Sequence, residues 1–559
     1  MDKSKVILVQ PPIQDFYLTK KRTIPYGLAS IASSIKEKGF NVEILDSLAT
    51  SKSKTIAYQD EFSFLYPFYG KKDITTFSLF HEFKHFGYSY EHIGTKIREK
   101  APFIVGISSL FTAYCNEALK TAQTIKKFYP HCKIVLGGHH PTFFPEHILS
   151  YPEIDFVIRG EGENSMALLC DALKNDSALK QIPGIAFRTK HSVYISDPFW
   201  AEDLNCLPLP AMEMINHHFY NRKNRYSTMV VSSRGCPMQC SYCSVSASSS
   251  HAPFRQRKID DIIMELKEQA KIHDIGFIDF EDENICLNKS WFMALFLKIK
   301  KLFEHKNVEL RAMNGLYPPA IDEDIVSLMK TSGFKTLNLS LGSTSKNQLK
   351  KFKRPDVITA FEHALFLAEK YELDCVSYII AAAPGQTAQS SLEDLLYLAQ
   401  KRTLAGLSIY YPSPGSLDYQ FCEKNQLLPE SFSLMRSTAF PLNNTTSRIE
   451  AVTLLRLSRI LNFMKHLIDT KSKIPESKPF FDQKKTASLD RQALSEELLQ
   501  WFLHDGKIRG LDPDKGIYTH IADSNLTQNF IKKIKTIPIA GIKQSAMGLN
   551  PVLESGIGL

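Results

Sequence analysis

The stretch SSRGCPMQCSYCSVS, residues 232–246, places Cys236, Cys240 and Cys243 within eight residues. A structural zinc site takes four protein ligands, and an iron–sulfur cluster held by cysteines usually takes four as well. Three thiolates on one short loop can hold three corners of a single [4Fe-4S] cube. The fourth iron atom would then stay open for a substrate or cosubstrate, as the open position of a catalytic zinc site does. A zinc loop completed by His251 or another cysteine is the alternative interpretation.

Composition and length bound the class of protein. The chain has 559 residues, which suggests about three or four domains, and its net charge of +9 comes from 68 basic and 59 acidic residues. This weak positive excess does not indicate nucleic acid as the main partner. The first apolar run is too short for a secretory signal, and no run is long enough to span a membrane. We therefore expect a soluble cytoplasmic protein whose clustered thiols bind metal before they form disulfides.

The first part of the chain alternates short apolar runs with helical patterns. Predicted helices cover residues 25–38 and 116–128, and the predicted strands are 5–10, 42–45, 103–108, 133–136 and 154–158. This order predicts a Rossmann-like, mostly parallel sheet in a domain of residues 1–190. Ligands of such sheets bind beyond the carboxyl ends of the strands. Residues 51–90 are rich in aromatic side chains and interrupt the pattern, so we predict an insertion packed over the ligand face.

A second alternating series follows a predicted linker at residues 191–225. Its predicted strands are 228–233, 276–280, 308–313, 336–341, 375–381 and 406–411, and its predicted helices are 259–273, 291–303, 322–332, 357–371 and 392–401. Six such units predict a partial (βα)6 barrel of the TIM type over residues 226–430, with chemistry on the loops after the strands. The three clustered cysteines follow its first strand directly. Residues 431–559 are predicted to be mostly helical and polar, with the last twenty poorly ordered.

The motif CxxxCxxC after the first strand of a partial barrel resembles the radical SAM enzymes. The resemblance implies that S-adenosylmethionine chelates the open iron atom through its amino and carboxylate groups. It also implies an external one-electron reductant, such as a flavodoxin or ferredoxin, and release of a 5′-deoxyadenosyl radical. Tyr242 occupies the position where the family places an aromatic residue against adenine.

Three later stretches resemble the family's loops at successive strand ends. FEDENICLN, residues 280–288, implies that Glu281, Asp282 and Glu283 receive the amino group of S-adenosylmethionine. LSLGSTS, residues 339–345, implies that Ser340, Gly342 and Ser343 lie near its ribose, although Thr344 stands where relatives often have glutamate. YIIAAAPGQT, residues 378–387, resembles a Gly-x-Ile-x-Gly-x-Pro-Gly-Glu-Thr pattern, with Gln386 in place of the glutamate. Each stretch alone also fits an ordinary strand-to-helix turn.

The first domain resembles the cobalamin-binding domain that precedes the barrel in one large radical SAM subgroup. The stretches that carry this resemblance are KVILVQPP, VGISS, VLGGHHPT and IRGEGE. The residues that it places around the nucleotide tail of the corrinoid are Ser108, Gly137, Gly138, His140, Gly160 and Gly162. For His140, hydrogen bonding within its own loop is the alternative. Many cobalamin domains carry a histidine ligand to cobalt after the first strand, but the loop PPIQDFYLTK here contains none.

Together the two motif sets imply a [4Fe-4S] cluster, S-adenosylmethionine and cobalamin as cofactors. We expect a C-methyltransferase that acts on an unactivated carbon of a small molecule or natural product. The alternatives are a cyclase or oxidoreductase that transfers no methyl group, and a redox or binding protein with a degenerate site. The sequence assigns no catalytic residue and no substrate. The insertion and the C-terminal region are expected to close a dry cavity between the two domains.

Overall fold

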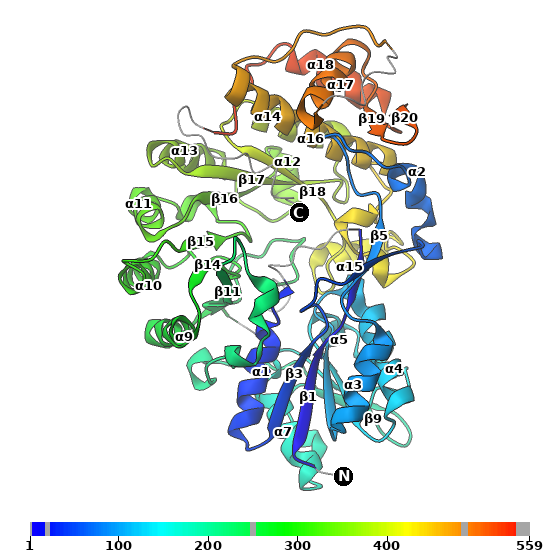
Figure 1. Cartoon of the computed structure of the whole chain (residues 1–559), viewed down its shortest axis with the longest axis vertical. Helices are drawn as coiled ribbons and strands as arrows, with labels where there is room; N and C mark the ends of the chain where they lie inside the picture. The colour runs from blue at the N-terminus through cyan, green and yellow to red at the C-terminus, as the bar shows by residue number, and fades with distance from the viewer. Residues whose placement is uncertain (1–2, 17–22, 246–252, 482–489, 544–559) are drawn as a thin grey trace.

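The computed structural model of the protein describes residues 3–16, 23–245, 253–481 and 490–543 (Figure 1). It contains a parallel-sheet unit at the N-terminus, a half-open ring of strands and helices, and a C-terminal region whose helices pack on the barrel at the end far from the N-terminal sheet. Within the described ranges, none of the helices combines the length and the apolar character that a membrane crossing requires. The zinc alternative that involves His251 lies outside the described residues, as do most of the last twenty residues.

The N-terminal sheet has seven strands in the order β10-β9-β8-β7-β6-β1-β3. The parallel strands are β1 (Lys5–Gln10), β3 (Asn41–Asp46), β6 (Ile104–Ser108), β7 (Lys133–Gly137) and β8 (Phe156–Ile158). All five were predicted. The antiparallel edge strands β9 (Ile185–Arg188) and β10 (Val193–Ile195) were not. The strand order reverses between β1 and β6, which places the ligand crevice of such a sheet at that point.

Both faces of this sheet are buried, which explains its continuous apolar strands. Val6 and Leu8 pack on one face under α1 (Tyr26–Glu37) and α7 (Gly162–Lys174). Ile7 and Val9 pack on the other face under α3 (Tyr90–Lys100) and α4 (Cys115–Phe128).

The second unit contains the six predicted strands in chain order, as two three-stranded parallel sheets. The first holds β11 (Tyr226–Val230), β14 (Ile275–Phe280) and β15 (Glu309–Ala312), and the second β16 (Thr336–Gly342), β17 (Asp374–Ala381) and β18 (Leu404–Ile409). Single bridges, Leu310 to Phe334 and Leu316 to Leu339, join the two sheets. Among the described residues no ladder links β18 to β11, so the barrel is open.

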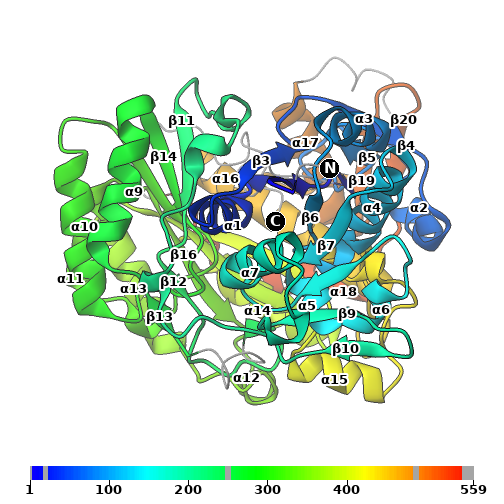
Figure 2. The ribbon, with the colours of Figure 1, turned by 90° about the horizontal axis from the view of Figure 1, so that it is seen from below.

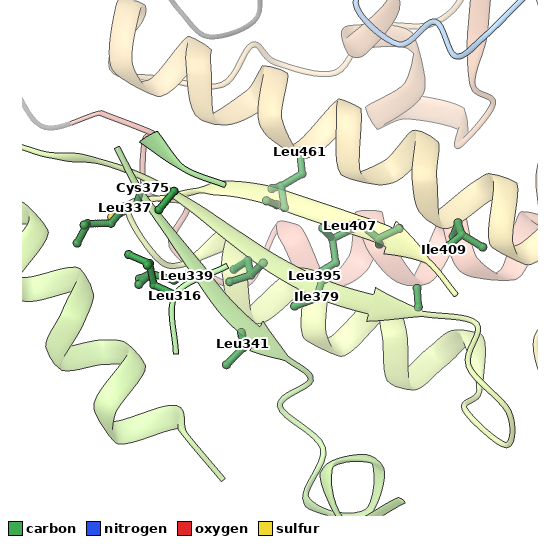
Figure 3. Packing of buried hydrophobic residues seen from close by; sticks show 14 of the residues in the cluster. Leu316, Leu337, Leu339, Leu341, Cys375, Ile379, Leu395, Leu407, Ile409 and Leu461 are labelled. Carbon is green, nitrogen blue, oxygen red and sulfur yellow. The ribbon is translucent and has the colours of Figure 1, made fainter. Parts of the chain in front are cut away.

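Helices cover the outside of the open barrel. They are α9 (Ile259–Ile272), α10 (Lys289–Leu302), α11 (Glu323–Ser332), α13 (Ile358–Lys370) and α14 (Ala388–Ala399). Alternate residues of the strands, such as Leu337, Leu339 and Leu341 of β16, point into this helical layer (Figure 3). Leu461 of α16 (Arg448–Lys471) belongs to the same cluster.

The helix α16 corrects the prediction of a polar C-terminal region. It packs on β18, and even its charged residues Arg456 and Lys465 are buried. Arg456 donates to the carbonyl oxygens of Phe68 at 3.2 Å and Phe77 at 3.1 Å, and Lys465 donates to that of Lys401 at 2.6 Å. Its polar composition therefore reflects buried cations that bind backbone carbonyls. The region also contains an unpredicted hairpin, β19 (Arg509–Asp512) and β20 (Gly516–Thr519), between α17 (Arg491–Asp505) and α18 (Ser524–Ile534).

The aromatic-rich insertion packs on the C-terminal region. Its elements are β4 (Ser53–Ile56), the 3-10 turn Asp60–Leu65, α2 (Tyr66–Tyr69) and β5 (Phe83–Phe86), and β5 pairs with both β4 and β2 (Ile13–Asp15) (Figure 1). The insertion carries Asp73, whose buried carboxylate forms a hydrogen bond with His520 Nε2 at 2.8 Å. Burial lowers the pKa of His520 to about 4, and the charge of Arg456 lowers it further. Two segments far apart in the sequence therefore form one layer.

A substitution at Gly510 tests the packing of this layer. A Cβ on Gly510 would lie 2.6 Å from His520 Nε2 and 2.7 Å from Asp73 Oδ2. We expect Gly510→Ala to lower the free energy of unfolding by about 1–3 kcal/mol, the usual cost of overpacking. Thermal unfolding followed by circular dichroism measures this. Gly27→Ala is the matched control, because a Cβ on that residue of α1 meets no atom within 4 Å. Equal midpoints for the two variants would contradict the packing described.

Candidate active site

The cysteine loop follows the first barrel strand, as predicted. After β11 the chain forms β12 (Ser233–Arg234), which pairs with β13 (Arg255–Gln256), and then enters the loop. Cys236 and Cys243 are half-buried and Cys240 is buried, and the Cys243 amide donates to the Cys240 carbonyl at 3.1 Å. All ten cysteines lie in the described part of the chain, and none forms a disulfide.

The three cysteine thiolates of the loop suit an iron–sulfur cluster. Across the described ranges, no three His, Cys, Asp or Glu side chains are grouped so that they could hold a metal ion. A zinc ion needs its ligands around one point, whereas each thiolate of a cubane binds a different iron atom. Three cysteines on one loop provide three such bonds and leave one iron atom for another ligand.

Two helices hold the middle of the loop. The Ser241 amide donates to the Phe352 carbonyl at 2.9 Å, and Ser241 Oγ donates to the Lys351 carbonyl at 3.0 Å, at the end of α12 (Lys346–Lys351). On the other side, the Asp418 amide of α15 (Leu417–Lys424) donates to the Ser241 carbonyl at 2.9 Å. The residue between Cys240 and Tyr242 is thus fixed from both sides.

Arg354 is the main polar residue of this region that the sequence analysis missed. Its guanidinium is buried and donates to Tyr242 Oη at 3.0 Å and Ser340 Oγ at 3.1 Å. Burial alone would lower the pKa of Arg354, but Tyr242 and Cys240 outweigh it and hold the pKa above its usual value. The backbone of Gly342 is left-handed, with φ +81°, and a Cβ there would press within 3.3 Å of the Arg354 side chain. Gly342 therefore leaves room for this cation. The only sequence signal was a basic residue in FKRPD, shortly after the LSLGSTS loop.

The three candidate acids take different positions. Asp282 is buried, and its carboxylate accepts from Ser232 Oγ at 2.7 Å and Ser233 Oγ at 2.5 Å, so it braces the start of the cysteine loop. The amide of Glu281, which is half-buried, donates to Val230 at 3.0 Å. Glu283 is exposed, although desolvation by the surrounding protein raises its pKa to about 7 and the charge of Asp282 adds to the shift.

The later motifs are braced in the same way. Ser343 Oγ donates to Asp394 Oδ2 at 2.7 Å, and the Thr344 amide donates to Asp394 Oδ1 at 2.6 Å. Gln386 is buried, accepts from the Ala383 amide at 3.1 Å and donates to the Ile380 carbonyl at 3.0 Å. Ser343 and Gln386 thus hold the shapes of their loops through bonds within the protein. Asp394 lies on α14, about fifty residues along the chain, and was not predicted.

The glycines at the strand ends of the first unit differ in role. A Cβ on Gly138 (φ +117°) would lie 2.7 Å from the Ser109 carbonyl oxygen. A Cβ on Gly160 (φ +82°) would lie 2.1 Å from the Phe199 carbonyl oxygen. A Cβ on Gly162 would meet Ile31 at 3.0 Å. Gly138 and Gly160 are thus required by the backbone around them, whereas Gly162 faces only the end of the Ile31 side chain. Gly137 is different, because its Cβ would meet only one carbonyl oxygen, at 3.7 Å.

Buried polar atoms without partners gather at the same edge. His140 is fully buried, and neither ring nitrogen has a hydrogen-bond partner among the described residues. The ring packs against Phe144 and Phe432, with centroids 5.0 and 4.9 Å away. Burial lowers the pKa of His140 to about 3, so the ring is neutral. The suggested hydrogen bond within its own loop is not formed by this side chain. Ser109 Oγ and Thr112 Oγ1, just beyond the half-buried Ser108, also have no hydrogen-bond partner in the part of the chain that the structure describes. Such atoms are rare in proteins and fit a region that receives a polar ligand.

Ion pairs join the strand ends of the two units. Arg234, two residues before the first cysteine of the loop, donates to Glu163 Oε1 at 2.5 Å, and Arg255 donates to Glu161 Oε1 at 2.9 Å. Glu161 and Glu163 belong to the IRGEGE stretch after β8. Burial disfavours the charge of Arg234, yet Glu163 and Glu161 raise its pKa above the ordinary value. The candidate cobalamin edge and the cysteine loop are therefore in direct contact.

Two family models match the chain: a B12 binding domain over residues 80–169 and the radical SAM superfamily over residues 230–398. An uncharacterized methyltransferase of Pyrococcus horikoshii is 26% identical to this chain. The alignment covers 77% of this chain and 85% of the methyltransferase. An anaerobic magnesium-protoporphyrin IX monomethyl ester cyclase of Rubrivivax gelatinosus is also 26% identical. That alignment covers 59% of this chain and 60% of the cyclase. The solved structure of the cobalamin-dependent S-adenosylmethionine radical enzyme OxsB has the same fold, with TM-score 0.59 at 14% identity, over 95% of this chain and 79% of that one.

The geometry around Arg354 predicts that this residue, more than Tyr242, holds the cysteine loop. Arg354→Gln would remove the donor from two partly buried hydroxyl groups, at a cost of about 1–3 kcal/mol. We expect a lower thermal midpoint and less than half of the wild-type iron content after anaerobic reconstitution. Tyr242→Phe removes one hydroxyl only and should retain most of the iron. Lys353→Gln, at the exposed neighbouring position, is the control. Full iron content in Arg354→Gln would refute this role.

Proposed function

Since the chain belongs to the radical SAM enzymes that carry a cobalamin-binding domain, we propose that it methylates a carbon atom of a small-molecule substrate. The observation that carries the proposal is the direct contact between the two strand-end edges, through Arg234 with Glu163 and Arg255 with Glu161. A methyl donor on one edge and a radical source on the other must face a single substrate. The alignment with the methyltransferase also covers more of both chains than the alignment with the cyclase.

The cluster-bound S-adenosylmethionine supplies a carbon radical that abstracts hydrogen, and the corrinoid supplies the methyl group. We assign the three iron ligands to Cys236, Cys240 and Cys243. Glu283 lies beside this loop, since its carboxyl group interacts with the Gly235 amide and its charge acts on Cys236. An ammonium group needs such an acceptor. Glu283 is therefore our assignment for the amino group of S-adenosylmethionine, while Asp282 positions the loop.

On the other edge, we assign Gly137 and His140 to the corrinoid. Gly137 leaves open space above the end of β7, and His140 offers two ring nitrogens without partners. Neutral imidazole can donate one hydrogen bond and accept another, which suits the polar tail of the cofactor. Ser108, Ser109 and Thr112 provide hydroxyl groups at the adjacent strand end.

Large apolar side chains at the strand ends fit a water-poor reaction space. Leu110 and Phe111 follow β6 and are 56% and 54% exposed, and Tyr411 follows β18 and is 43% exposed. They belong to the ligand edges of different units. Exclusion of water protects a carbon radical from side reactions. We infer that these residues line the substrate space between the two edges.

Reconstitution tests the proposal. After anaerobic loading with iron, sulfide and hydroxocobalamin, the protein with dithionite should convert S-adenosylmethionine to 5′-deoxyadenosine, and replacement of any of the three cysteines by alanine should abolish this.

Gly137→Val should fold and retain the iron but lose corrin absorbance after gel filtration. Equal corrin retention by wild type and Gly137→Val would refute the assigned edge, and absence of 5′-deoxyadenosine would refute the radical reaction. A product heavier by one methylene supports methyl transfer, whereas a dehydrogenated or unchanged product supports cyclisation or oxidation.

The raised pKa of Glu283, about 7, predicts a pH dependence of cosubstrate binding. Below pH 7 the carboxyl group is protonated and neutral, so it loses its attraction for the ammonium group. Affinity for S-adenosylmethionine should therefore rise from pH 6 to pH 8, by at most about tenfold per pH unit. Isothermal titration calorimetry of the reconstituted protein measures this. Glu283→Gln should bind more weakly at pH 8 and show a flat profile, while Glu304→Gln, at an exposed site on another loop, should follow the wild type.

A further inference from the structure

The proposed reaction consumes one electron per radical, and the present inference rests on that function. An external donor loses one electron and the cluster gains it, before the carbon–sulfur bond of S-adenosylmethionine is cleaved. We propose that an acidic one-electron carrier protein docks on the surface formed by α12 and α15 beside the cysteine loop. We call this surface the donor face and define it by Lys346, Lys350, Lys351, Lys353, Leu417 and Phe421.

The donor face lies next to the loop that carries the cysteines. Ser241, adjacent to Cys240, is hydrogen-bonded to the Lys351 and Phe352 carbonyls on one side and to the Asp418 amide on the other. Figure 2 shows α12 and α15 at the same edge of the molecule. A carrier bound there would be separated from the thiolates by little more than the loop itself.

The charge of the donor face is not compensated. Residues 346–354, KNQLKKFKR, contain five basic side chains and no acid. The four lysines are exposed, and none forms an ion pair with a described residue. Some other surface lysines of the barrel have acidic partners: Lys289 pairs with Asp322, Lys298 with Asp260 and Lys370 with Glu323. The positive potential beside the loop is therefore available to an acidic partner.

The donor face also has an apolar part. Leu417 and Phe421 of α15 are 41% and 49% exposed, and their spacing of four places them on the same side of the helix. Apolar contacts beside a charged rim are the usual anatomy of a transient protein interface. The lysines would speed the encounter, and the apolar pair would hold the complex. The acids on or next to these two helices are the half-buried Asp418 and the exposed Glu423 of α15, and Asp356, which accepts from the Ile358 amide at 3.1 Å.

A flavodoxin with an acidic surface is a suitable probe, with dithionite as a small reductant that needs no docking. The test variant is the reconstituted holoenzyme that carries both Lys350→Glu and Lys353→Glu. Biolayer interferometry should show that it binds flavodoxin at least about tenfold more weakly than the wild type. Electron paramagnetic resonance should show that flavodoxin reduces its cluster more slowly, to a similar extent. The matched control is Lys300→Glu with Lys301→Glu, which makes the same charge change on exposed positions of α10. Both pairs should react with dithionite as the wild type does. Added salt should weaken wild-type binding more than binding of the doubly reversed variant.

Glu423→Lys separates a docking effect from damage to the fold. It adds a positive charge to α15, so flavodoxin binding should become several-fold tighter, and misfolding cannot produce that gain. Phe421→Ala should weaken binding with little change in its salt dependence. Wild-type affinity in the Lys350 and Lys353 variant, or no gain in Glu423→Lys, would overturn the proposal. Tighter binding of a short oligonucleotide than of flavodoxin would also overturn it, because the face would then be a nucleic-acid site. If dithionite itself yields no 5′-deoxyadenosine in the wild type, the proposed function fails instead.

Discussion

The ion pairs between Arg234 and Glu163 and between Arg255 and Glu161 are the interaction on which the candidate site depends. The arginines lie on the short strands that flank the cysteine loop, and the glutamates follow a strand of the parallel sheet. All four side chains are largely shielded from water. Loss of one partner from a buried pair leaves an uncompensated charge and typically costs about 3–5 kcal/mol. These contacts therefore fix the position of one cofactor edge relative to the other.

Most polar side chains near the site bind one another. Asp282 holds two serines, Asp394 holds Ser343 and Thr344, and Gln386 closes its own turn. These hydrogen bonds between protein groups limit the motion of the loops and fix the positions of the side chains that are left to bind ligands. Glu283, His140, Ser109 and Thr112 differ from these, since no comparable network engages their side chains among the described residues. A site for radical chemistry benefits from this rigidity, because a reactive intermediate must meet its intended partner before any other.

The insertion and the C-terminal region together form the third layer of the molecule. Arg456 reaches from α16 to two carbonyl oxygens of the insertion, and Asp73 reaches back to His520. Phe62, Leu65 and Phe83 of the insertion join the core cluster of the barrel. This layer therefore belongs to the same folded body as the barrel. Its position against both units agrees with a role in enclosing the space between them.

The sequence by itself determined the order of the parallel strands in both units, the helices that cover the barrel and the place of the cysteine loop. Those signals are local: apolar runs set by burial on both sheet faces, helical periodicity, and cysteine spacing within one loop. The assignments of Asp282, Ser343 and Gln386 as ligand contacts rested on the resemblance to the family's loops, and the structure gives these side chains partners within the protein. The partners of Gln386 are local, within six residues. The tertiary structure alone decided the distant partners, which lie 50 residues away for Asp282, 51 for Ser343, 112 for Arg354 and 447 for Asp73. A buried polar group must find a partner wherever the fold brings one, and no local pattern encodes that choice. The charged residues of α16 show the same limit, since only the packed structure turns a polar sequence into a buried helix.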